Sequence, residues 1–173
     1  MVSAVASVER IWDWLADVAD PEIPVISVVD LGIVRAVELA ADGVCTVTIT
    51  PTYSGCPAMR VIADAVGDAL RARGVAEVRV LSQLAPAWST DWMSEDGRRK
   101  LLEYGVAPPA QKVVDISALS TGVRRHATPA PRVACPLCGS VHTSVVSQFG
   151  STPCKALYRC LDCSEPFDYF KCH

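Results

Sequence analysis

Residues 44 to 74 read VCTVTITPTYSGCPAMRVIADAVGDALRARG, and this stretch decides the fold of the first part of the chain. Its opening residues alternate apolar side chains with threonine, which predicts a strand with one buried face. After the loop PTYSG, Pro57 suits the first position of a helix and Gly74 suits its end. Apolar residues recur between them at the spacing of one helical face. A strand followed directly by an amphipathic helix predicts an α/β layer.

The flanking segments extend this domain in both directions. The further predicted elements are a helix over residues 8 to 19, strands over 33 to 39 and 75 to 84, and a helix over 94 to 105. Ser7 suits the N-cap of the first helix, and the turn ADG joins the first two strands into a hairpin. We therefore expect a two-layer α/β domain over residues 1 to 105, with a small sheet and two to three helices.

The composition changes after residue 105. The segments APPA and ATPAPR are typical of a linker, which we place over residues 106 to 132, before a small module over 133 to 173. Half of the 173 residues are hydrophobic and a fifth are charged, as in globular proteins. The net charge of -3 gives no reason to expect a nucleic-acid partner. Without a signal-peptide pattern or a membrane-length apolar run, we expect a cytoplasmic protein.

The tail contains two Cys-x-x-Cys pairs, in CPLCGS and YRCLDC. They are Cys135 with Cys138 and Cys160 with Cys163. Two such pairs can face each other and present four thiolates to a tetrahedral metal ion, so we expect a β zinc ribbon. Gly139 permits a left-handed conformation after the first pair, whereas Ser164 makes the second turn less suitable. An iron-sulfur cluster also binds four thiolates, and the spacing does not separate the two.

Two further cysteines in the tail, Cys154 and Cys172, are not needed by a single zinc ion. Both suit semi-buried positions as small residues. Both also suit a redox or metal-handling pair near the ribbon. The sequence leaves these two interpretations open.

Cys56, in the segment SGCP, is predicted to be the N-cap of the second helix. The helix dipole and the free N–H groups there favour a thiolate, so we expect a lowered pKa and a reactive thiol. A simple capping role is the alternative. Thr52 adds a hydroxyl, and Asp20 and Glu22 either close on this loop as iron ligands or flank a turn. Cys45, on the apolar face of its strand, is expected in the core.

Several segments carry a resemblance to known families. DPEIPVISVVDLGIV and VTITPTYSGCPAM resemble the small α/β domain of SufT-like iron-sulfur assembly proteins, over about residues 7 to 105. YGVAPP, CPLCGS, FGSTPCKALYRCLDC and EPFDYFKCH resemble the D subunits of bacterial phenylacetyl-CoA epoxidases, which extends the likeness over nearly the whole chain.

The resemblance implies an accessory or maturation factor of phenylacetate breakdown, which is not itself expected to catalyse epoxidation. The protein would bind zinc and would handle iron or a labile iron-sulfur cluster for the oxygenase or its reductase. The resemblance leaves open whether it forms a homodimer. The family's key residues would be Asp20, Glu22, Thr52 and Cys56, and its tail cysteines Cys135, Cys138, Cys154, Cys160, Cys163 and Cys172. The alternatives are a zinc-ribbon docking protein without metal transfer and a thiol oxidoreductase that uses Cys56.

Overall fold

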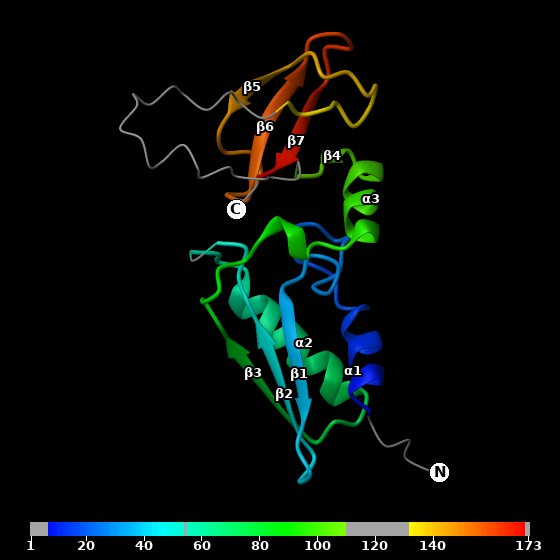
Figure 1. Ribbon diagram of the computed structural model, residues 1–173, viewed down its shortest axis with the longest axis vertical. Helices are drawn as coiled ribbons and strands as arrows, with labels where there is room; N and C mark the ends of the chain where they lie inside the picture. Colours follow the sequence, from blue (N-terminus) through cyan, green and yellow to red (C-terminus); the bar gives the residue numbers. More distant parts are fainter. Residues whose placement is uncertain (1–6, 54, 110–131, 172–173) are drawn as a thin grey trace, which may run out of the picture.

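The computed structural model describes residues 7–53, 55–109 and 132–171. The elements of the first part are α1 (Val8–Leu15), β1 (Val34–Leu39), β2 (Val44–Ile49), α2 (Met59–Ala72), β3 (Glu77–Ser82), a 3-10 helix (Thr90–Trp92) and α3 (Glu95–Glu103). Those that follow are β4 (Val106–Ala107), β5 (Thr143–Ser147), β6 (Lys155–Cys160) and β7 (Pro166–Phe170). They build two separate sheets, one at each end of an elongated molecule (Figure 1).

The first sheet has the order β1-β2-β3, in which β1 and β2 form an antiparallel hairpin and β2 and β3 run parallel. Gly43 turns the hairpin at φ 87°, a left-handed conformation that glycine adopts without strain. Because β2 and β3 are parallel, the chain crosses between them through α2, whose apolar side packs on the sheet together with α1. The predicted two-layer α/β class is therefore confirmed for this part of the chain.

Local signals set the helix ends that the sequence indicates. The Ser7 hydroxyl accepts a hydrogen bond from the Arg10 N–H at 3.3 Å, and the Ser94 hydroxyl accepts one from the Gly97 N–H at 2.9 Å. Each serine satisfies an N–H group that has no partner within its helix. The side chain of Cys45, a residue of β2, is fully buried in the core, as the strand alternation predicts.

The second sheet has the order β4-β7-β6-β5. Val106 and Ala107, which the composition assigns to the start of a linker, instead form β4 and pair in parallel with β7. Both residues are buried, but a two-residue strand has no periodicity that a sequence pattern could reveal. The chain thus passes from α3 directly into the ribbon sheet. The rest of the predicted linker, over residues 110 to 131, lies outside the described residues.

The ribbon is packed against the first domain through the end of β7. Phe170 is only 1% exposed, and its ring centroid lies 6.0 Å from that of Trp88. The Trp88 Nε1–H group donates a 2.9 Å hydrogen bond to the Leu31 carbonyl, which fixes the indole against the first domain. Phe170 and Cys154 therefore belong to the core of the first domain, although the sequence places both in the ribbon.

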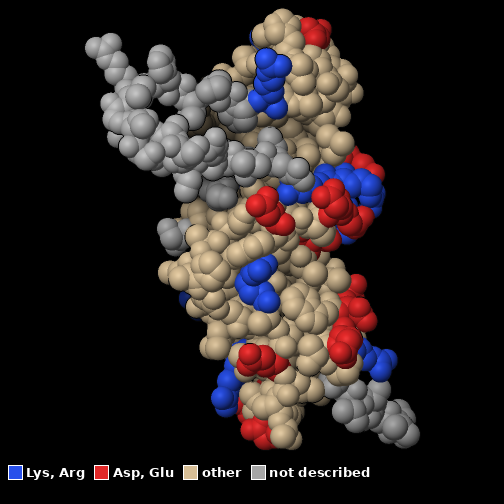
Figure 2. Space-filling model, in the orientation of Figure 1, with Lys and Arg blue, Asp and Glu red and all other residues tan. Residues whose placement is uncertain are grey.

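Charged side chains of both signs are distributed over the face shown in Figure 2 and gather around α3. There Arg99 pairs with Asp96 and with Glu103, and Lys100 pairs with Asp30 at 2.7 Å. The ribbon end of this face is mostly uncharged. Within the described ranges, none of the helices has the length and apolar character needed to span a bilayer.

Candidate functional site

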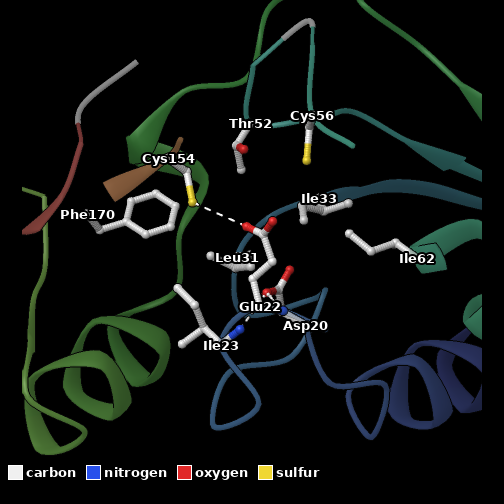
Figure 3. A pocket seen from close by; sticks show the side chains of 10 residues that line it. All are labelled: Asp20, Glu22, Ile23, Leu31, Ile33, Thr52, Cys56, Ile62, Cys154 and Phe170. Atoms are coloured by element: carbon white, nitrogen blue, oxygen red, sulfur yellow. Dashed lines mark hydrogen bonds between the residues drawn. The ribbon is translucent and has the colours of Figure 1, made fainter. Parts of the chain in front are cut away.

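A small cavity of about 10 Å³, partly open to solvent, lies between the first domain and the ribbon (Figure 3). Its polar lining residues are Asp20, Glu22, Thr52, Cys56 and Cys154. Its apolar lining residues are Ile23, Leu31, Ile33, Ile62 and Phe170. The four residues that the resemblance assigns to iron handling thus line one cavity, together with a thiol from the ribbon.

Asp20 shapes the loop that presents Glu22 to this cavity. The Asp20 Oδ1 atom accepts hydrogen bonds from the N–H groups of Glu22 at 2.9 Å and Ile23 at 2.8 Å. This turn, typical of aspartate, fixes the backbone so that the Glu22 carboxylate extends between the two thiols (Figure 3). Burial raises the pKa of Asp20, and the two N–H groups offset only part of that rise. The pair forms a turn and also lines the cavity, and its role as iron ligands stays a prediction.

The prediction that Cys56 caps the second helix is wrong. The helix begins at Met59, and Ala58 is its N-cap, while Cys56 lies earlier in a turn closed by its N–H bond to the Tyr53 carbonyl at 3.1 Å. The thiol still points into the cavity beside Thr52 (Figure 3).

The prediction of a lowered pKa for Cys56 is also wrong. Burial raises the pKa of this thiol, and the charges of Glu22 and Asp20 raise it further. The N–H groups of Ala58 and Met59 favour the thiolate, as expected near a helix start, but they do not outweigh burial. Cys56 is thus a protonated thiol at neutral pH, held beside carboxylates.

Cys154 is the residue whose position the sequence did not indicate. Its side chain is 5% exposed, and its Sγ atom lies 3.6 Å from Glu22 Oε2, to which it donates a hydrogen bond, and 3.0 Å from Thr152 Oγ1. Burial raises the pKa of this thiol to about 11, and Glu22 adds to the rise. The available signals were its place outside both Cys-x-x-Cys pairs and its inclusion among the tail cysteines that the resemblance implies. Cys172, its suggested partner, lies outside the described residues.

The four paired cysteines form a separate site in the ribbon. The Sγ atoms of Cys135, Cys138, Cys160 and Cys163 all lie within 4.8 Å of one another. Such a group of four thiols fits a tetrahedral zinc ion. The Cys163 N–H group lowers the pKa of Cys160 and so favours the thiolate form in which cysteine binds zinc.

The two cysteine turns adopt the same left-handed backbone in different ways. Gly139 has a φ of 75° at no steric cost, as predicted. Ser164 has a φ of 67°, a conformation that costs a residue with a Cβ atom roughly 1–2 kcal/mol. Ligand binding by the second pair therefore has to offset a small backbone strain.

Comparison with known proteins identifies both parts of the chain. Residues 8–80 match the family described as iron-sulfur cluster assembly protein, and residues 120–171 match the family described as PaaD zinc beta ribbon domain. A Fe-S protein maturation auxiliary factor of Porphyromonas gingivalis is 41% identical over 56% of this chain and 90% of its own length. The crystal structure of a domain of unknown function from Bacillus anthracis, 29% identical, superimposes on 54% of this chain and 90% of its own length with a TM-score of 0.51.

One relative matches nearly the whole chain. A protein of Escherichia coli (strain K12), provisionally named as the D component of 1,2-phenylacetyl-CoA epoxidase, is 50% identical over 95% of this chain and 93% of its own length. Both resemblances drawn from the sequence are thereby confirmed. The chain belongs to the family of 1,2-phenylacetyl-CoA epoxidase D subunits, in which an iron-sulfur cluster assembly domain precedes a zinc ribbon.

Proposed function

We propose that this chain is a cytoplasmic accessory subunit of the phenylacetyl-CoA epoxidase that transiently holds iron or an iron-sulfur cluster for the oxygenase or its reductase. The observation that carries the proposal is the meeting of Cys56 with Asp20 and Glu22 in one cavity of the assembly domain. The names of its relatives, an epoxidase subunit and Fe-S maturation factors, point the same way. In this role the chain prepares a metal centre and does not itself perform the epoxidation.

The chemistry of the cavity suits iron as a substrate. Thiolates bind iron in clusters, and carboxylates bind it as harder ligands. Burial together with neighbouring negative charge raises the pKa values of Asp20 and Cys56. A bound cation would stabilise the charged forms of both side chains and so lower these pKa values. The bound protons would then leave to solvent.

The spacing of the cavity ligands differs from that of the ribbon thiols. Among the described residues, the ribbon cysteines are the one group in which three or more potential metal-binding atoms of His, Cys, Asp or Glu lie within 4.8 Å of one another. The cavity of about 10 Å³ has room for a single ion, so its side chains have to draw together around one iron and have to move apart to bind a cluster. This arrangement suits a site that takes up and releases its cargo.

The ribbon offers a surface for a client protein. Leu137 beside the first cysteine pair and Val141 after it are 61% and 59% exposed, and Leu161 within the second pair is 47% exposed. Apolar side chains grouped in this way are typical of protein contact sites. They favour the second candidate function, a docking protein that recruits an epoxidase component through the ribbon without transferring metal.

The thiol oxidoreductase alternative has less support. A nucleophilic cysteine needs a lowered pKa or an adjacent base, and the pKa of Cys56 is raised. His142, the histidine within the described residues, pairs with Asp162 in the ribbon at 3.0 Å.

Anaerobic loading of the zinc-bound chain with ferrous iron, with and without sulfide, tests the proposal. The wild type should retain iron after desalting, whereas Cys56→Ser should retain much less, with an unchanged zinc content. Cys45→Ala is the matched control, because it removes a buried thiol outside the cavity. Equal iron retention by Cys56→Ser and the wild type, or no retention by the wild type, would leave the docking function as the conclusion.

A further inference from the structure

The cavity is built by two parts of the chain, and the ribbon contributes its second thiol. Cys154 immediately precedes β6, and its carbonyl accepts a 2.9 Å hydrogen bond from the Lys171 N–H group just after β7. The Lys155 N–H group donates to the Thr152 carbonyl at 3.1 Å, which closes the turn around Cys154. The thiol is therefore positioned by the ribbon backbone, on the end of the ribbon that faces the first domain.

Three contacts hold this end of the ribbon against the first domain. Phe170 packs on Trp88, as described above. The strand pair β4 and β7 ties the ribbon sheet to the chain leaving α3. Arg98 of α3 donates to the Pro109 carbonyl at 2.9 Å, which holds the segment that follows β4. The position of Cys154 is thus determined by packing at several points and not by one flexible loop.

The immediate surroundings of Cys154 differ from those of a cysteine that only fills space. Cys45 is such a residue, since it is fully buried within an apolar core. Cys154 is nearly as buried, yet its Sγ atom lies 3.6 Å from a Glu22 carboxylate oxygen, in the cavity that Cys56 lines from the other domain. Figure 3 shows the two sulfur atoms on either side of Glu22.

Zinc binding does not account for this thiol. The four paired cysteines form a complete tetrahedral set, and Cys154 is not among them. It is a cysteine of the zinc module that is directed toward a different site.

We propose that Cys154 and Cys56 together bind the iron cargo, with Glu22 between them, so that the ligand set is complete only when the ribbon is docked on the assembly domain. This inference rests on the proposed function. Each thiol loses its proton to solvent as its sulfur–iron bond forms, and no electron is transferred. Because each part of the chain supplies one of the two thiols, loss of either thiol should weaken binding.

The test measures iron affinity by competition with a chelator, on the full zinc-loaded chain under anaerobic conditions. Cys154→Ala should weaken iron binding at least about tenfold, since even indirect partners of metal ligands change affinity by that much. Cys56→Ser should have a similar effect, and Cys45→Ala none. One arm uses ferrous iron alone and the other uses iron with sulfide, which distinguishes a single ion from a cluster.

X-ray absorption of the ferrous-iron arm provides a second readout. The number of sulfur neighbours of iron should fall in Cys154→Ala and in Cys56→Ser relative to the wild type. Cys154→Ser, which keeps the size of the side chain, should behave like Cys154→Ala and separates ligand loss from a packing defect. Zinc content and melting temperature check that each variant is folded.

The outcomes separate this inference from the proposed function. If Cys56→Ser loses iron and Cys154→Ala and Cys154→Ser keep it with unchanged sulfur coordination, the two-part ligand set is overturned and the proposed function stands. If the wild type binds no iron in either arm, both are overturned.

Discussion

Docking of the ribbon should make Cys154 an unusually slow thiol in the iron-free protein. Thiolates, and not thiols, react with iodoacetamide. At about pH 8, a thiol with a pKa of 9.0 is about one-tenth thiolate, whereas one with a pKa of about 11 is about one-thousandth thiolate. Cys154 should therefore be alkylated about 100-fold more slowly than the same residue in the denatured chain, before steric protection is counted.

The pH dependence of alkylation shows whether the pKa of Cys154 is raised or lowered. Because the pKa is raised, the alkylation rate of Cys154 should continue to rise about tenfold per pH unit beyond pH 9 and should level off only near pH 11. In the denatured chain, the rate should level off near pH 9. Mass spectrometry that resolves each cysteine follows the modification over time.

Glu22→Gln tests the cause of this slow reaction. The Glu22 carboxylate accepts the thiol hydrogen bond and adds negative charge, so its neutralisation should lower the pKa of Cys154 and speed alkylation by about three- to tenfold. Glu38→Gln on β1 removes an equal charge outside the cavity and should leave the rate unchanged. If native Cys154 reacts as fast as in the denatured chain, or if both glutamine variants behave alike, the described contact between ribbon and cavity is refuted.

Three further outcomes test the metal site and the fold. Cys138→Ser should lose most of the zinc, which metal analysis of the wild type should give as about one per chain, and a variant that keeps full occupancy would contradict the ribbon site. Leu70→Ala should lower the free energy of unfolding by about 2–5 kcal/mol in urea titration, whereas Leu81→Ala, 53% exposed, should change it by less than about 0.5 kcal/mol. Gly32→Ala should lower it by at least about 1 kcal/mol, because Gly32 has a φ of 70° and an added Cβ would clash with the Trp92 carbonyl; an unchanged melting temperature would argue against that close approach.

The first domain and the zinc site could be predicted because their signals are local. The alternation in β2, the apolar face of α2 and the Ser7 cap each depend on neighbours within a few residues. The cysteine pairs are equally local, since each presents its two thiols from a single turn, with Gly139 permitting the left-handed backbone. Backbone geometry and side-chain periodicity are fixed by the sequence at this range.

Tertiary structure alone decided the properties of the candidate site. Cys154 meets Glu22 across 132 residues of sequence, through a ribbon anchored by the short strand β4 that no pattern reveals. The shift in the pKa of Cys56 was predicted in the wrong direction. The helix start, which is visible in the sequence, favours the thiolate, but burial, which is not visible there, raises the pKa by more. Burial and charge act through space, so the ionisation of a thiol depends on which distant side chains the fold places beside it.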